Sequence, residues 1–161
     1  MKFKTGENNI TYIDSNFQEW FGEMKVEKSK EKLIVQKLPR YMTDREILDE
    51  LKPKECTLGD VYHALQGENM LKNSYANIFY AKDSSGVLRA VLVHWNDDGW
   101  VVRASSIEHP YGWYNGHQVF SRNSVLKPSD TSPQTLRDFD PLTLALKTVI
   151  DAGYIVYKQV K

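Results

Sequence analysis

The sequence predicts an α+β protein: an antiparallel β-meander of about four to six strands with three to four helices packed on one face. Two observations support this fold class. Four positions carry the side chains that begin helices, a serine, threonine or aspartate followed by a suitable partner within the first turn. Between residues 76 and 121 the chain instead shows short runs rich in aromatic and β-branched residues, separated by turn-forming residues.

Length and composition limit the classes of protein to consider. With 161 residues, 41% of them hydrophobic, the chain fits a single globular domain over 1–161. Its 21 basic and 21 acidic residues give no net charge, which does not favour binding to nucleic acid or an anionic membrane. The single cysteine, Cys56, cannot form an internal disulfide, and no apolar run is long enough for a signal or a membrane span. We therefore expect a cytoplasmic protein with no membrane partner.

Paired capping residues predict the helices in order. The first three pairs are Ser15 with Gln18, Thr43 with Glu46, and Thr57 with Asp60. A fourth helix is expected from Asp140, as its cap, to a terminating glycine at Gly153. Residues 23–32 hold seven charges of mixed sign and are interpreted as a connector. Residues 122–139, which include a proline-rich and serine-rich stretch, are expected to form an exposed loop.

The predicted strands lie mainly between the third and fourth helices. The four clearest runs cover 76–82, 87–95, 100–106 and 117–121. Turns rich in aspartate and glycine separate the first three runs, so these should form an antiparallel meander. A strand over 32–38 is expected at a sheet edge, and a last strand over 154–160 should follow the fourth helix.

The window from Trp95 to Phe120 carries the strongest functional signal. It contains three of the four tryptophans, and residues 109–121 include no aspartate, glutamate, lysine or arginine. These rings either cover the sheet or bind a partner, and interface cores favour tryptophan and tyrosine over charge. The leading hypothesis is a non-enzymatic binding module whose loop 111–117 engages a macromolecular partner, most simply a protein, with Trp113 as anchor. The candidate binding residues are Trp95, Tyr111, Trp113, Tyr114, His117, Arg122 and Asn123.

A second hypothesis is a small-ligand binder or hydrolase-like enzyme with a pocket on the face of the sheet. His94 or His117 would act as the base, and Arg122 would orient an anionic group. This pocket requires the three side chains to converge. The sequence leaves catalysis undecided and implies no cofactor.

Other sites have weaker support. His94, His109 and His117, with Asp97 and Asp98, could hold zinc, but their spacing matches no metal motif and we expect no metal. Cys56 and His63 are seven residues apart, about 10 Å along a helix, which is too far for a nucleophile and its base.

Nucleic acid is also a weak candidate partner. The helix pair over 43–66 has the outline of a helix-turn-helix, but its link contains Pro53 and its second helix lacks lysine and arginine. Double-stranded DNA is therefore not expected. A single strand could stack on exposed aromatic rings, although acidic residues lie close in sequence to Arg103 and Arg122.

Overall fold

The computed structural model describes residues 2–67 and 70–123, which belong to one compact unit ending at Asn123. The helix expected from Asp140, the strand expected over 154–160 and the loop after Asn123 lie outside the described residues. The unit is α+β, with six strands in one sheet. None of its described helices is long and apolar enough to cross a membrane.

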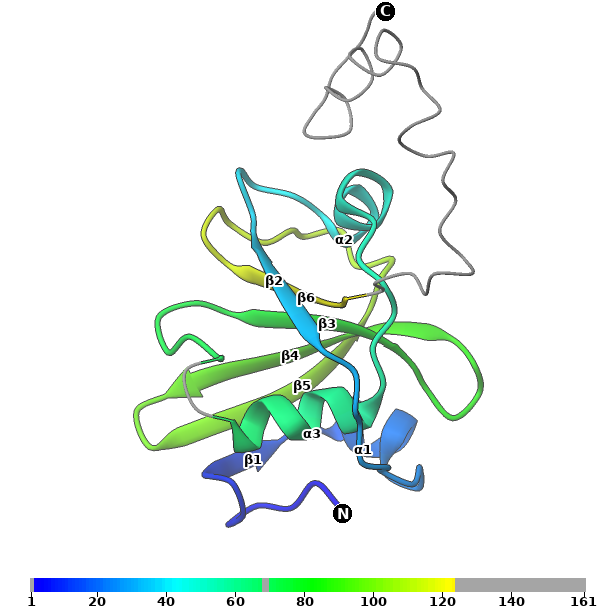
Figure 1. Cartoon of the computed structure of the whole chain (residues 1–161), viewed down its shortest axis with the longest axis vertical. Helices are drawn as coiled ribbons and strands as arrows, with labels where there is room; N and C mark the ends of the chain where they lie inside the picture. The colour runs from blue at the N-terminus through cyan, green and yellow to red at the C-terminus, as the bar shows by residue number, and fades with distance from the viewer. Residues whose placement is uncertain (1, 68–69, 124–161) are drawn as a thin grey trace, which may run out of the picture. The chain divides into compact units, whose positions relative to one another are not determined.

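The sheet has the strand order β1-β5-β4-β3-β6-β2 (Figure 1). Its strands are β1 (Ile10–Ile13), β2 (Leu33–Lys37), β3 (Asn77–Lys82), β4 (Leu88–Asn96), β5 (Gly99–Ser106) and β6 (Gln118–Arg122). The expected meander is present as β3, β4 and β5, which pair antiparallel in succession. The expected edge strand is β2, which pairs antiparallel with β6.

The prediction of a purely antiparallel sheet is wrong, because β1 pairs parallel with β5 and β3 pairs parallel with β6. Strand β1 was not predicted at all. It has only four residues, and it follows Asn8 and Asn9, which both have positive φ. Parallel pairing joins segments that are distant in sequence, so no turn-forming residues between the two strands predict it.

The helical segments are α1 (Ser15–Phe21), α2 (Asp44–Glu46), the π-helical turn η1 (Ile47–Leu51) and α3 (Leu58–Gln66). The capping boxes predicted at Thr43 and Thr57 are both present. The cap of the first helix is Asp14 instead of Ser15, since the Asp14 carboxylate accepts the Phe17 amide at 2.8 Å. This one-residue shift accompanies the burial of Phe17 and Phe21 in the core.

Apolar side chains pack on both faces of the sheet. On one face α1 and α3 share a cluster with residues of β3, β4 and β6, including Phe17, Val61, Phe79, Val93 and Phe120. Because successive side chains of a strand point to opposite faces, their neighbours in sequence lie on the other face.

That other face holds a second cluster, in which η1 and the segment before α2 contribute Ile47 and Met42, and the sheet contributes Ile78, Tyr80 and Val119. The expectation that all helices lie on one face is therefore wrong. In Figure 1, α2 lies well apart from α1 and α3. The burial of β3 agrees with this arrangement: its first five residues are all buried, as expected for a strand that is covered on both faces of the sheet.

Residues 23–32 contain no helix or strand, but part of this connector packs against the core. Val26 is buried with the α1 and α3 cluster. A Cβ atom at Gly59 would lie 1.9 Å from the Glu27 carbonyl oxygen, so only glycine allows this approach to α3. The charged connector is thus anchored to the core.

Candidate functional site

The aromatic loop, residues 111–117 between β5 and β6, is attached to the segment just before α2. Met42 and Trp113 exchange two backbone hydrogen bonds of 3.0 and 2.8 Å, which form an isolated antiparallel bridge. A Cβ atom at Gly112 would lie 2.5 Å from the Met42 carbonyl oxygen, so glycine is required there. The C-terminal end of the aromatic loop is also held in place, because the Gly116 amide donates to the Leu38 carbonyl at 2.9 Å.

Trp113, the expected anchor for a partner, is turned partly inward. Its indole Nε1 donates to Asp44 Oδ1 at 2.9 Å, and the Tyr80 hydroxyl donates to the same oxygen at 2.6 Å. Trp113 also packs against the cluster that contains Met42 and Ile47. The structure therefore places this ring where it holds the loop in position, with less surface free for a partner than the sequence suggested.

Asp44 is an ionisable residue at the centre of this attachment, and its side chain is buried. Its second oxygen, Oδ2, has no hydrogen-bond partner among the described residues. Burial raises the pKa of Asp44, and the hydrogen bonds from Tyr80 and Trp113 oppose that rise. Burial also raises the pKa of Tyr80, which keeps its hydroxyl protonated and able to donate.

Two rings of the aromatic loop point away from the core. The side chains of Tyr111 and Tyr114 are 70% and 67% exposed, the highest values among the large hydrophobic residues described. Tyr41, also exposed, lies beside them: its ring centroid is 5.3 Å from that of Tyr114, and its hydroxyl accepts the Gly112 amide at 2.6 Å. Tyr41, Tyr111 and Tyr114 are called the tyrosine surface below.

Charges near the tyrosine surface are neutralised in pairs. Arg40, the residue before Tyr41, forms an ion pair with Glu50, and Arg45 forms one with Glu108. A groove beside Tyr111 is lined by both polar and apolar groups, including Asn16, Arg103 and Trp113. Beside the exposed rings, Arg40 and Arg45 are therefore paired with glutamates, whereas Arg103 contacts His94 and the Tyr12 ring.

No protein-family model, curated protein or solved structure matches the chain. What the chain does must therefore be inferred from the geometry of its described residues. In that part of the chain, no three histidine, cysteine, aspartate or glutamate side chains are grouped to hold a metal. Asp97 and Asp98 lie in the turn between β4 and β5, and His109 Nδ1 accepts the Tyr111 amide at 3.2 Å.

His94 and His117, the candidate bases, each have one ring nitrogen engaged by a neighbour. His117 Nδ1 accepts the Ala76 amide at 2.9 Å, and His94 Nε2 accepts from Arg103 Nε at 3.2 Å. Burial lowers the pKa of both histidines, and the charge of Arg103 lowers that of His94 further. A neutral imidazole has one nitrogen that can accept a proton, and in each of these rings that nitrogen already accepts a hydrogen bond.

The structure does not bring the histidines and Arg122 together. Arg122 follows Phe120 by two residues on β6 and therefore shares its face, the face covered by α3. His94 directly follows Val93, another residue of that face, and so lies on the opposite face. His117 precedes β6 and lies with Trp113, at 6.3 Å between ring centroids.

The remaining candidate binding residues lie apart from the tyrosine surface. Trp95 packs edge-on against Trp100 across the β4–β5 hairpin, with ring centroids 5.0 Å apart. The Asn123 backbone amide donates to the Lys32 carbonyl at 2.7 Å and so extends the pairing of β6 with β2. These contacts give both residues structural roles in the sheet.

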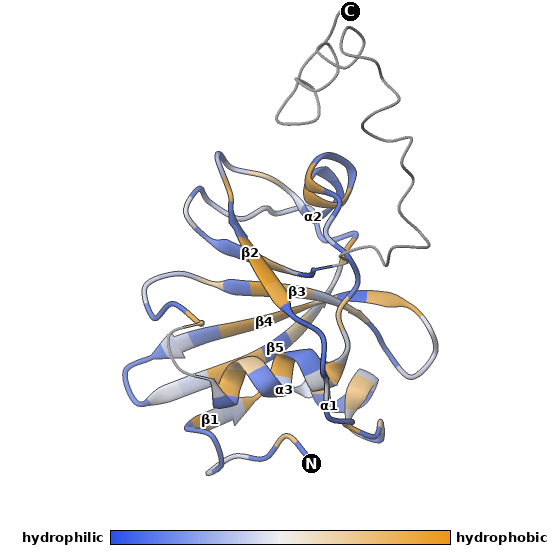
Figure 2. Cartoon of the chain, in the orientation of Figure 1, coloured by the Kyte–Doolittle hydropathy of each residue, from blue (hydrophilic) through white to orange (hydrophobic). Residues whose placement is uncertain are grey.

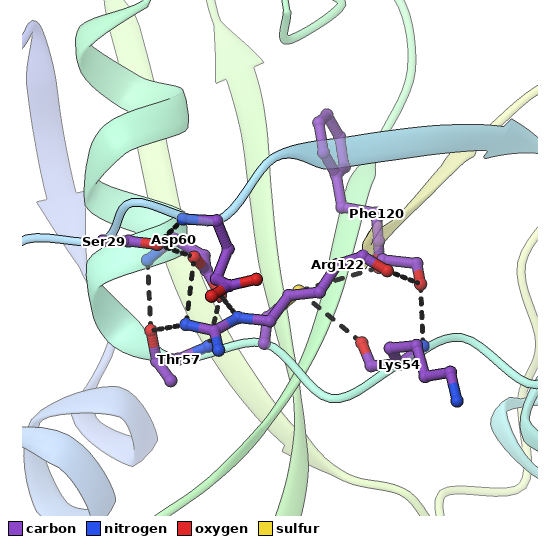
Figure 3. Close-up of polar contacts among 9 residues, drawn as sticks. Ser29, Lys54, Thr57, Asp60, Phe120 and Arg122 are labelled. Carbon is purple, nitrogen blue, oxygen red and sulfur yellow. Dashed lines mark hydrogen bonds and ion pairs between the residues drawn. The ribbon is translucent and has the colours of Figure 1, made fainter. Parts of the chain in front are cut away.

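Arg122 forms an ion pair with the buried Asp60 (Figure 3). Arg122 Nε donates to Asp60 Oδ2 at 2.7 Å, and the Thr57 amide donates to the same oxygen at 2.8 Å. The Ser29 hydroxyl donates to the other oxygen, Oδ1. The hydrogen bond that Arg122 donates to Asp60 raises the pKa of Arg122, and the carboxylate joins the connector, α3 and the end of β6. In the structure the group that Arg122 binds is therefore a carboxylate of the protein itself.

Cys56 is fully buried, and His63 is exposed on α3. The Cys56 thiol lies 3.8 Å from the Phe120 carbonyl oxygen and 3.9 Å from that of Lys54. Burial raises the pKa of this thiol to about 12, so almost none of it is thiolate at neutral pH.

The folded protein is therefore expected to resist thiol reagents. At pH 8 a disulfide reagent such as Ellman's reagent should leave Cys56 unmodified, and it should titrate one thiol per chain once urea unfolds the protein. A Val87→Cys variant, with its new thiol in an exposed turn, provides a fast-reacting control. Native Cys56 reacting as fast as that control thiol would contradict the burial described here.

Proposed function

We propose that this chain is a binding module that engages a protein partner through the tyrosine surface. The observation that carries the proposal is the exposure of Tyr111 and Tyr114 on a loop that is itself held by the Met42–Trp113 bridge. A rigid loop loses little conformational freedom when it binds, and tyrosine contributes large contact area with few rotatable bonds. The single cysteine is consistent with a cytoplasmic location, which forms part of the proposal.

The local charges favour a protein over a nucleic acid as the partner. A phosphate backbone requires cationic groups free to meet it, whereas Arg40 and Arg45 beside this surface are paired with glutamates. Rings surrounded by neutralised charge instead match the centre of a protein interface, where tyrosine is enriched and charge depleted. Binding through such a surface should depend little on ionic strength.

The test uses site-specific photocrosslinking in cells followed by binding with purified proteins. A benzophenone amino acid replaces Tyr111 or Tyr114 in turn, and Val87 in the control chain. Val87 is also exposed, and it lies in the turn at the opposite end of β3 from the aromatic loop. We expect one protein to be captured from both loop positions and not from the control position.

The captured protein is then purified and its affinity is measured at two salt concentrations. The double variant Tyr111→Ser/Tyr114→Ser should bind at least about 10-fold more weakly than wild type, as expected for the loss of a central tyrosine contact. Val87→Ser should bind as wild type does. Equal capture from all three positions, or unchanged affinity of the double variant, would exclude the tyrosine surface as the binding site. An affinity that falls steeply with salt would indicate that charge pairs, and not the tyrosine rings, drive the binding.

A further inference from the structure

Strand β2 forms one edge of the sheet and carries exposed apolar side chains. Ile34 is 45% exposed and Val35 is 38% exposed, and they point to opposite faces of the strand. Figure 2 shows the middle of β2 as hydrophobic. Natural edge strands usually avoid this combination, because an apolar strand with a free edge pairs readily with another strand.

The outer edge of β2 has a defined set of backbone groups available for pairing. The Lys32 carbonyl accepts from Asn123, and the Leu38 amide donates to His117, so the even-numbered residues face β6. In an antiparallel ladder alternate residues face opposite sides. The amides and carbonyls of Leu33, Val35 and Lys37 therefore point outward, and no group among the described residues hydrogen-bonds to them.

We propose that two copies of this chain pair through their β2 strands, antiparallel and about a two-fold axis at Ile34. A single symmetric contact of this kind closes on itself and gives a dimer. In this register Leu33 of one copy lies opposite Val35 of the other, and both use outward-facing backbone groups. Ile34 faces its own counterpart, with its backbone groups directed toward β6.

Charge complementarity selects this register from its neighbours. With the axis at Ile34, Glu31 of each copy lies opposite Lys37 of the other, which gives two cross-strand pairs of opposite charge. Moving the axis to Val35 keeps the backbone geometry but sets Glu31 opposite Pro39, which lacks an amide hydrogen. An axis between Ile34 and Val35 would place Lys32 opposite Lys37 and would pair outward-facing residues with inward-facing ones. Only the axis at Ile34 uses both the free backbone groups and the charges.

A disulfide placed on the axis tests the register directly. Opposite residues at a non-hydrogen-bonded antiparallel position have Cα atoms about 4.5 Å apart, within the range for a disulfide. The full chain with Ile34→Cys should therefore form a covalent dimer under mild oxidation, free of interference from the buried Cys56. Val87→Cys, equally exposed at 46%, should not. Gln36→Cys should not form a covalent dimer either, because in this register position 36 of one copy lies roughly 13 Å along the strand from position 36 of the other.

A second arm tests the dimer without cysteine, by sedimentation of the full chain. Wild type should sediment as a dimer. Val35→Pro removes an outward-facing amide hydrogen while leaving the ladder with β6 intact, so this variant should be a monomer with a cooperative melting transition. Lys37→Glu sets like charges opposite each other and should shift the equilibrium toward monomer, and adding Glu31→Lys should restore the dimer.

Two results would overturn the proposal. One is a wild-type chain that sediments as a monomer at its highest soluble concentration, with Ile34→Cys forming no more covalent dimer than Val87→Cys. The other is a dimer that survives Val35→Pro unchanged, which would place the contact elsewhere. Cross-linking of Val35→Cys in place of Ile34→Cys would overturn the register argued from the charges. None of these outcomes depends on the tyrosine surface, which belongs to a different segment of the chain.

Discussion

Replacing Asp60 with alanine should lower the free energy of unfolding by about 3–5 kcal/mol, the usual cost of removing one partner of a buried ion pair. The Asp60 side chain is fully buried, and it accepts hydrogen bonds from Arg122, from the Thr57 amide and from the Ser29 hydroxyl. The variant loses the capping box of α3 together with the ion pair. Urea unfolding, followed by far-ultraviolet circular dichroism, measures the loss.

Removing the other partner of this ion pair should also destabilise the fold. Arg122→Met removes the guanidinium but leaves Asp60 bonded to Thr57 and Ser29, and the methionine can still pack along the sheet. Because Arg122→Met also leaves the Asp60 charge buried without its counter-charge, we expect it to cost about as much as Asp60→Ala at neutral pH, while the capping box of α3 is kept. An exposed acidic residue on η1, Asp49, gives the matched control, and Asp49→Ala should change stability by less than about 0.5 kcal/mol. An Asp60→Ala variant as stable as Asp49→Ala would contradict the structural role assigned to this carboxylate.

Asp44→Ala should lower the free energy of unfolding by about 2–6 kcal/mol, because it leaves one buried and one partly buried hydrogen-bond donor without an acceptor, at about 1–3 kcal/mol each. These donors are the Tyr80 hydroxyl and the Trp113 indole. Since Trp113 holds the aromatic loop, the variant should also show a weaker near-ultraviolet circular dichroism signal before unfolding begins. Asp49→Ala again provides the control, and an intact near-ultraviolet signal in Asp44→Ala would show that the loop does not depend on this carboxylate.

The same carboxylate should give stability a specific pH dependence. Burial raises the folded-state pKa of Asp44 above its ordinary value of 3.8, so ionisation costs more in the folded state than in the unfolded state. Its favourable contribution is fully present below pH 3.8 and is lost as the pH rises through the folded-state value. Asp44→Asn keeps an oxygen that can accept both hydrogen bonds and removes the charge. Its unfolding free energy relative to wild type should therefore increase from acid to neutral pH, and a constant difference would contradict the raised pKa.

The sequence predicts the parts of this fold that depend on neighbouring residues. The capping boxes at Thr43 and Thr57 satisfy helix amides with side chains three residues apart, and the β4–β5 turn is built from residues that favour turn geometry. The edge position of β2 was also predicted from its own residues, because glutamine and lysine follow its three apolar residues.

Features that depend on distant residues were not predicted. The parallel pairing of β1 with β5 joins positions about 90 residues apart, and nothing in the four residues of β1 specifies that partner. The burial of Asp44 was missed for a similar reason. An aspartate after a helix cap is typical of an exposed first turn, and only Tyr80 and Trp113, from two other segments, account for its place in the core.

The contacts of the individual rings in the aromatic loop could not be predicted from the sequence. The uncharged run around Trp113 distinguishes this loop from the rest of the chain, and Tyr111 and Tyr114 are exposed there. Composition alone does not separate a ring that faces solvent from one that anchors the loop, since both roles favour aromatic residues. Tyr41 was missed because it joins the surface through a contact with Gly112, 71 residues later in the chain.

The pairing of β1 with β5 has a consequence for the order in which the protein folds during synthesis. Ile10 lies opposite Trp100, and the Asp14 side chain that caps α1 also accepts the Ala104 amide. When the ribosome has released the first strand and helix, their partners are still about 90 residues from being made. Closing so long a loop is slow compared with forming the local β4–β5 hairpin, so the hairpin should form first and the N-terminal segment should dock onto its completed edge. Strand β1 and helix α1 are therefore synthesised before β4 and β5 but reach their final positions after them.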